Sequence, residues 1–241
     1  TAPLEGVIRV TVTHFKGTTP KRPDYPVRES AVTPIITADA TACTFQSGAL
    51  TARVDQTPEG WRVDYLGDGR RLTGSGYHGM AHALNTQTGK AYMVDSLMLD
   101  VGEWVYGLGE RFTPYLKNGQ TVEMWNEDGG TASEIAYKNV PFYMTNRGYG
   151  IFVDDPSDVS FEVASEKVER VQFSVEGERL SYYVIYGPTP KEILNRYTRL
   201  TGRPALPPAW SFGLWLTTSF TTSYDESTTS SFIQGMADRD I

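Results

Sequence analysis

The feature that most constrains the fold is a series of short segments rich in β-branched and aromatic residues, each bounded by turn-forming residues. These segments are residues 6–15, 42–55, 60–67, 91–99, 148–155, 159–166, 168–177 and 180–187. In residues 171–175 the apolar side chains fall at every second position, as in a strand with one buried face. Turn signals such as Asp68-Gly69 and Asn118-Gly119 separate the segments. Many short strands at this spacing predict a mainly β protein with a β-sandwich over residues 1–188.

The pattern changes at residue 189, where Thr189-Pro190-Lys191-Glu192 forms a capping box with proline at the first helical position. A helix is predicted to follow and to end at Gly202 and Pro204. Its apolar face would contain Ile193, Leu194, Tyr197 and Leu200.

Residues 211–217 form an apolar run that predicts a buried strand of the parallel type. A second capping box, residues 223–226, predicts a further helix. Its inward residues would be Phe232, Ile233 and Met236. Strand, loop and helix in this order indicate an α/β domain that begins within residues 189–241 and lacks its remainder. Because no initiator Met is present and an apolar segment starts again near Ile241, we expect a piece of a longer protein.

Composition excludes several function classes. A formal net charge of -7 argues against nucleic acid as a partner, since nucleic-acid-binding proteins carry a basic patch. The single cysteine, Cys43, excludes an internal disulfide and a cysteine cluster for zinc. No apolar run reaches the roughly 18 residues of a membrane span, and no N-terminal signal pattern is present. We therefore expect a soluble, cytoplasmic protein with no membrane contact.

Residues 106–131 are the best candidate for a binding loop. The segment opens on glycines, continues through Glu110 and Arg111, and closes on Trp125, Asn126, Glu127 and Asp128. An aromatic face beside amides and carboxylates suits a sugar, which offers C–H surface and hydroxyl groups. Glu110, Glu123, Glu127 and Asp128 are also candidates for an acid/base pair, although the sequence gives no distance between them. The alternatives are, for Glu110, an ion pair with Arg111 or Arg147 or a hydrogen bond to loop backbone, and for Asp128, a turn-anchoring role before Gly129-Gly130.

Two other patterns carry less weight. Residues 74–79 match G-x-G-x-x-G, but no long helix is predicted after them, so dinucleotide binding is not favoured. His78 and His82 have the spacing of a metal pair on a helix. Since no third ligand is evident and the segment is not helical, they are interpreted as exposed loop histidines.

Three long blocks, residues 106–130, 137–163 and 187–226, strongly resemble glycoside hydrolase family 31. YGLGER and RPALPPAWSFGLW are the most distinctive parts. The resemblance runs in colinear order from about Gly6 to the C-terminus. Among the branches of the family, the chain is most similar to the bacterial α-xylosidases.

The resemblance implies a galactose-mutarotase-like β-sandwich followed by the first βα unit of a truncated (β/α)8 barrel. It implies retaining hydrolysis of α-glycosides by two aspartates, a nucleophile and a general acid/base, both beyond Ile241. The chain would then contain no catalytic residue and would be inactive alone. No cofactor and no metal are expected.

The resemblance also implies two substrate-binding residues, Asp128 in the sandwich loop and Phe220 in the loop after the first barrel strand. Trp125 is expected to support the Asp128 loop, and Trp215 to lie in the barrel core. The expected partners are an α-xyloside oligosaccharide, the remainder of the catalytic barrel and further copies in a homo-oligomer. Two alternatives stay open, namely an α-glucosidase of the same family and a non-catalytic carbohydrate-binding or structural sandwich.

Overall fold

The computed structural model describes residues 1–15, 17, 23, 25–30, 32–76, 78–127, 133–215 and 222–241. The chain forms two compact units, Thr1–Arg203 and Pro204–Ile241. All named strands lie in the first unit.

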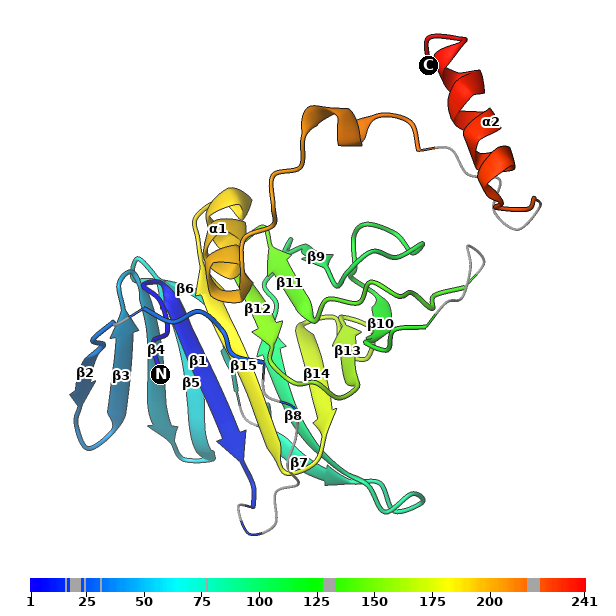
Figure 1. Ribbon diagram of the computed structural model, residues 1–241. Coiled ribbons are helices and arrows are strands. Elements are labelled where there is room, and N and C mark those ends of the chain that lie inside the picture. Colours follow the sequence, from blue (N-terminus) through cyan, green and yellow to red (C-terminus); the bar gives the residue numbers. More distant parts are fainter. Residues whose placement is uncertain are drawn as a thin grey trace. The chain divides into compact units, whose positions relative to one another are not determined.

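The first unit contains three five-stranded sheets, all of whose strand pairs are antiparallel (Figure 1). The first has the order β1 (Val7–Thr13), β15 (Arg179–Tyr186), β12 (Tyr149–Val153), β11 (Phe142–Thr145) and β9 (Val105–Gly107). The second has the order β10 (Gln120–Glu123), β13 (Val159–Val163), β14 (Arg170–Glu176), β8 (Ala91–Met98) and β7 (Ala81–Leu84). The third has the order β2 (Ile35–Ala38), β3 (Ala42–Ser47), β4 (Leu50–Thr57), β5 (Gly60–Gly67) and β6 (Arg70–Ser75). The mainly β prediction is confirmed.

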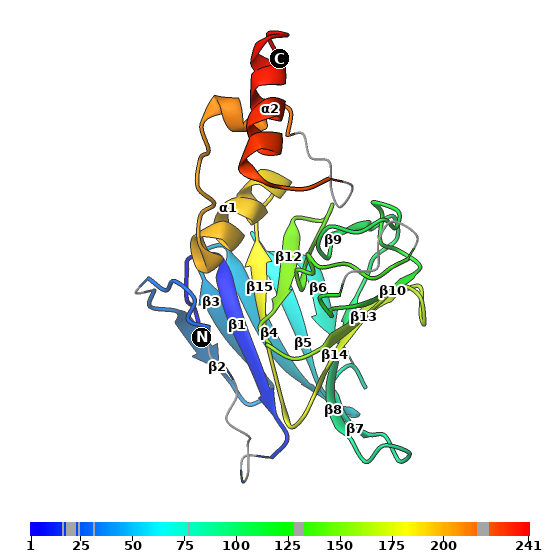
Figure 2. The same cartoon turned by 45° about the vertical axis from the view of Figure 1, so that its right-hand side comes forward.

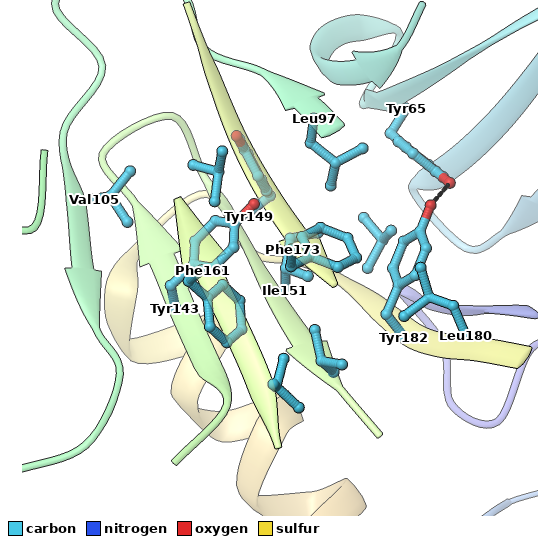
Figure 3. Packing of buried hydrophobic residues seen from close by; sticks show 14 of the residues in the cluster. Tyr65, Leu97, Val105, Tyr143, Tyr149, Ile151, Phe161, Phe173, Leu180 and Tyr182 are labelled. Carbon is cyan, nitrogen blue, oxygen red and sulfur yellow. Dashed lines mark hydrogen bonds between the residues drawn. The ribbon is translucent and has the colours of Figure 1, made fainter. Parts of the chain in front are cut away.

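Alternation along the strands positions the core. In β14, Val171, Phe173 and Val175 are fully buried while the residues between them are half-buried, as the sequence predicts. The central strand β15 differs, because it is buried on both faces. Leu180, Tyr182 and Val184 pack into the main core with residues of all three sheets (Figure 3). Tyr183 and Ile185 face a smaller cluster on the other side.

Helix α1 (Pro190–Thr201) covers that second face. The predicted capping box is present, since the Thr189 side chain accepts from the Glu192 amide and the Glu192 carboxylate accepts from the Thr189 amide. Ile193 and Leu200 are buried against the first sheet, and the Tyr197 ring stacks on Phe142 at a centroid distance of 4.0 Å. Leu194, which was expected on the apolar face, is 40% exposed.

The second unit departs from the expected strand. Residues 209–212 form a short 3-10 helix, η1 (Ala209–Phe212), and residues 213–215 have no regular structure. Phe212 and Trp215 are 74% and 72% exposed, so Trp215 is not a core residue here. Within the described residues no strand lies beside this segment to supply the hydrogen bonds that a parallel strand requires. The last two residues of the expected strand, 216 and 217, lie outside the described residues.

Helix α2 (Glu226–Ala237) is present, but its first turn and its inner face differ from the prediction. Asp225, and not Ser223, is the N-cap, and its carboxylate accepts a 2.9 Å hydrogen bond from the Thr228 amide. Hydrogen bonds from Ser227 and Thr228 lower the pKa of Asp225. No residue of α2 is buried, and Phe232 and Ile233 are exposed. Neither helix in the described ranges is long and apolar enough to cross a bilayer.

A buried carboxyl group connects the three sheets of the first unit. Asp95 of β8 is fully buried and accepts hydrogen bonds from Ser75 Oγ of β6 at 2.7 Å and from Tyr182 Oη of β15 at 2.8 Å. The Tyr182 hydroxyl is in turn 2.9 Å from that of Tyr65 on β5 (Figure 3). Burial raises the pKa of Asp95, although the hydrogen bonds from Ser75, Tyr182 and the Ser96 amide oppose this shift. The network therefore joins all three sheets through side chains inside the core.

The raised pKa of Asp95 predicts a specific pH dependence of stability. The folded carboxyl binds its proton more tightly than the unfolded one, so this group favours folding fully below the unfolded pKa of about 3.9. That contribution is lost as pH rises through the folded pKa. As pH rises, we expect the free energy of unfolding of the wild type to fall by about 1.4 kcal/mol for each unit by which folding raises this pKa. Asp95→Asn has no proton to lose at this position, so its free energy of unfolding should not show this fall. Urea unfolding of both proteins between pH 4 and pH 8 measures the difference. Parallel pH profiles would contradict the prediction.

Candidate substrate-binding loop

The two predicted substrate-binding residues lie outside the part of the chain that the structure describes. Asp128 falls within residues 128–132, and Phe220 falls within residues 216–221. The described part of the candidate loop, residues 106–127, and the segment that follows it, residues 133–140, lie on either side of residues 128–132 and belong to the first unit. Their geometry shows how the chain on either side of Asp128 is fixed.

The loop begins where strand β9 pairs with β11. Beyond this pair, the backbone at Gly109 passes so close to residues 138–140 that a Cβ atom would lie 2.1 Å from the Lys138 carbonyl oxygen. Gly109 also has a φ of +88°, which a side chain rarely allows. Leu108 has a φ of +66°, and its full burial and a 2.8 Å hydrogen bond from its amide to the Phe142 carbonyl hold it there. The glycine-rich start of the loop is therefore required by close backbone packing.

Arg111 joins three parts of the loop. Its guanidinium donates hydrogen bonds to the carbonyl oxygens of Leu108 at 3.0 Å, Glu134 at 3.0 Å and Glu123 at 2.6 Å. It also donates to the Asn139 side-chain oxygen. Partial burial lowers the pKa of Arg111, while the nearby Glu123 and Glu134 carboxylates raise it. Since arginine remains charged in proteins, the group acts as a permanent multiple donor to backbone carbonyls.

Asn139 closes the base of the loop on both sides of residues 128–132. Its Nδ2 donates to the carbonyl oxygens of Trp125 at 2.7 Å and Ala136 at 2.6 Å, and to Asn126 Oδ1 at 2.9 Å. Asn126 and Ala136 form a parallel bridge, and the Glu127 amide donates to the Ala136 carbonyl at 3.1 Å. The chain that enters residues 128–132 is thus tied to the chain that leaves them.

Two of the candidate carboxylates, Glu110 and Glu123, contact residues of the first unit. Glu110 pairs with Lys138 at 3.1 Å, and not with Arg111 or Arg147 as expected, because the Arg111 side chain turns inward to the carbonyl groups. Both members of the Glu110–Lys138 pair are largely exposed. Glu123 Oε1 accepts a 2.7 Å hydrogen bond from Ser160 Oγ of the neighbouring strand β13. Glu110 and Glu123 are therefore held by partners of the first unit.

Exposed aromatic rings surround this base. Phe112, Tyr115, Trp125 and Tyr137 are 60–76% exposed. Among the described residues, Trp125 supports the loop through its backbone carbonyl, which accepts from Asn139, and its side chain is 60% exposed. Strands β9 and β10 and the connection between them lie on the same side of the sandwich (Figure 2). This side therefore presents the flat apolar faces and hydrogen-bonding groups that a sugar needs.

Sequence patterns did not reveal Arg111 and Asn139 as the residues that fix the loop. Most of their contacts reach across 12 to 28 residues of the chain, so no periodicity marks them. The sequence offered only local signals for these two residues. Arg111 comes shortly after the glycine-rich turn at residues 107–109, and Asn139 lies in a segment with no regular pattern of apolar residues.

Three comparisons with known proteins bear on this loop. Residues 1–162 match the family model for the glycosyl hydrolase 31 N-terminal galactose mutarotase-like domain. The α-xylosidase XylQ of Lactiplantibacillus pentosus is 48% identical over 241 residues, which are 100% of this chain and 31% of that protein. An α-xylosidase of Emericella nidulans is 45% identical over 260 aligned positions, covering 100% of this chain and 33% of that protein. The chain spans about a third of the length of these curated relatives.

A solved structure shows the same fold. The cycloalternan-forming enzyme from Listeria monocytogenes, in complex with a pentasaccharide substrate, superposes with a TM-score of 0.79. The match covers 100% of this chain and 23% of that chain at 22% sequence identity. At this identity the likeness concerns the fold alone.

The loop geometry predicts that Asn139→Ala loosens the chain around residues 128–132. The substitution removes a donor from the partly buried bond to the Ala136 carbonyl and from the exposed bond to the Trp125 carbonyl, and we expect it to cost about 1 kcal/mol. Amide hydrogen exchange should accelerate at Glu127. Its amide donates to the Ala136 carbonyl, which also accepts a hydrogen bond from Asn139.

Asn85→Ala is the matched control, because Asn85 also caps a turn through backbone amides, those of Gln87 and Thr88. It should leave exchange at Glu127 unchanged. Equal acceleration by both variants, or none by Asn139→Ala, would contradict the role of Asn139.

Proposed function

The chain belongs to glycoside hydrolase family 31, and we propose that it is the N-terminal part of a retaining α-xylosidase. The parent enzyme releases non-reducing-end α-linked xylose from short xylo-oligosaccharides and uses no cofactor. The observation that carries this proposal is the identity of 48% and 45%, along the whole chain, to two proteins named α-xylosidases. The exposed aromatic rings beside the ordered loop base support a sugar as the ligand.

The chain's two parts have different roles in this proposal. Residues 1–188 form the sandwich that presents the substrate loop, and residues 189–241 form the linker helix and the start of the (β/α)8 barrel. Exposed apolar side chains in the second unit support this division, namely Trp210, Phe212, Leu214 and Trp215. Side chains of this kind are normally buried, here by the further strands of the barrel. Both catalytic aspartates then lie beyond Ile241, so this chain supplies none.

Asp128 and Phe220 are the proposed substrate-binding residues. A carboxylate at Asp128 would accept hydrogen bonds from sugar hydroxyl groups. The bonds that Asn139 makes to Trp125 and Ala136 support a loop held in one position. Phe220 would pack on the face or edge of the sugar ring. Crowding around C6 would favour xylose over glucose, because xylose lacks the hydroxymethyl group.

The proposal extends to partners and location. The chain is completed by the remainder of its own barrel, the parent assembles into a homo-oligomer, and the enzyme works in the cytoplasm. Its substrate is an α-xyloside oligosaccharide.

Turnover of aryl glycosides tests the proposed activity. We expect the full-length parent to hydrolyse an aryl α-xyloside with a higher kcat/KM than the matching aryl α-glucoside, since the site excludes a C6 group. The 241-residue chain alone should give no turnover, because it lacks both catalytic aspartates. The measurement is release of the aryl group by each protein with each substrate.

The outcomes separate the alternatives. A higher kcat/KM for the α-glucoside would make the parent an α-glucosidase of the same family. A full-length protein without turnover, whose isolated chain nevertheless binds xylose in a titration, would favour a non-catalytic carbohydrate-binding sandwich. Turnover by the isolated chain would overturn the placement of the catalytic residues.

Substitution of Asp128 tests its role as a ligand. In the full-length parent, Asp128→Ala should lower kcat/KM for the aryl α-xyloside by about 10- to 100-fold, since charge-assisted hydrogen bonds contribute about 1.5–3 kcal/mol. Glu110→Ala is the control, because Glu110 lies in the same loop but forms an exposed ion pair with Lys138. Exposed pairs contribute little, so kcat/KM should change less than about twofold. Equal effects of the two variants would remove Asp128 from the site.

A further inference from the structure

Three side chains that are distant in sequence meet at one end of the sandwich. His14 directly follows β1, His82 lies in β7, and Glu178 lies in the turn between β14 and β15. Both views show the end of β1, strand β7 and this turn at the lower end of the first unit (Figures 1 and 2). His82 is thus not the exposed loop histidine expected from the sequence, since it is a strand residue with a 24% exposed side chain.

The carboxylate of Glu178 contacts both imidazole rings. Its Oε2 is 2.7 Å from His14 Nδ1, and its Oε1 is 3.2 Å from His82 Nε2. The two rings stack with their centroids 3.8 Å apart and an interplanar angle of 8°. The backbone holds this arrangement, because the His14 amide donates a 3.0 Å hydrogen bond to the Glu178 carbonyl.

The residue types of the cluster suit a cation. The possible ligand atoms are one ring nitrogen of each histidine and a carboxylate oxygen, and the carboxylate lies against both rings. Neutral imidazole and carboxylate are the forms that bind metal ions. Side-chain exposures of 53% for His14 and 31% for Glu178 leave the donors accessible from solvent.

We propose that His14, His82 and Glu178 form a binding site for a divalent transition-metal ion, with Zn²⁺ as its preferred occupant. Two imidazoles and one carboxylate are a three-ligand set that zinc accepts with water as the fourth ligand. The donor atoms lie within 4.8 Å of one another. Tetrahedral zinc with bonds of about 2.0–2.1 Å places its ligands about 3.3 Å apart. Because the two rings are stacked nearly parallel, at least one imidazole turns out of the stack when both bind the same ion in their ring planes. The imidazoles select zinc, nickel or copper over magnesium and calcium.

The site links two sheets and is separate from the substrate loop. His14 and Glu178 adjoin β1 and β15 of the first sheet, whereas His82 belongs to the edge strand β7 of the second. An ion bound to all three would hold the ends of these sheets together. Because the unfolded chain does not bring the three residues close, binding would stabilise the folded state selectively. The ion would therefore act as a structural clip.

Zinc titration of the untagged chain, freed of metal by chelation, tests the site. We expect binding of one Zn²⁺ by calorimetry and a rise in Tm of about 5–10 °C when free zinc is 100 times Kd. His14→Ala and His82→Ala should each weaken binding by more than about tenfold, and Glu178→Gln should also weaken it. Mg²⁺ and Ca²⁺ should leave Tm unchanged.

His78→Ala is the matched control, because it removes the remaining histidine of the chain, which lies outside the cluster. It should bind zinc as the wild type does. Circular dichroism of each metal-free variant verifies its fold, and the double variant His14→Gln/His82→Gln preserves polarity at both positions. Absence of zinc binding by the wild type, or equal binding by this folded double variant, would overturn the proposal.

Discussion

The fold depends on one carboxyl group that stays inside the core. Asp95 of the second sheet accepts hydrogen bonds from Ser75 of the third sheet and Tyr182 of the first. Apolar contacts are not directional, so they allow sheets to slide against one another, whereas a satisfied polar network has one geometry. An unpaired buried carboxyl is costly, so only the arrangement that brings both hydroxyls to Asp95 avoids this cost. The network therefore selects the relative placement of the three sheets.

A different kind of interaction orders the candidate loop. Between strands β10 and β11 the described chain has no regular ladder of backbone hydrogen bonds, so side chains take over that role. Arg111 serves three carbonyl groups and Asn139 serves two. Carbonyl groups outside a regular ladder need other donors, and these two side chains supply them. Side chains on the surface of the loop can thus vary while its base keeps the same hydrogen bonds.

Sequence patterns predicted what local rules determine. The alternation in β14 and the capping box at Thr189 required no knowledge of distant residues, and both are present. Edge strand β2 was not predicted, because all four of its residues are exposed and no buried face marks them. Arg111 and Asn139 were missed for a different reason, since most of their partners lie 12 to 28 residues away along the chain. Asp128 and Phe220 came from family resemblance and stay predictions.

The strand expected at residues 211–217 is not formed over its described part, residues 211–215. A comparison with strand β15 explains the difference. Strand β15 and residues 211–215 are both rich in large apolar side chains. In β15, strands β1 and β12 supply hydrogen bonds on both edges, and α1 and the main core cover both faces. Residues 211–215 have no such neighbours among the residues described, and their rings remain exposed. Whether an apolar segment forms a buried strand depends on the neighbours that pair with it and cover it as much as on its own sequence. The pattern at 211–217 therefore fits a strand only where further strands stand on either side of it.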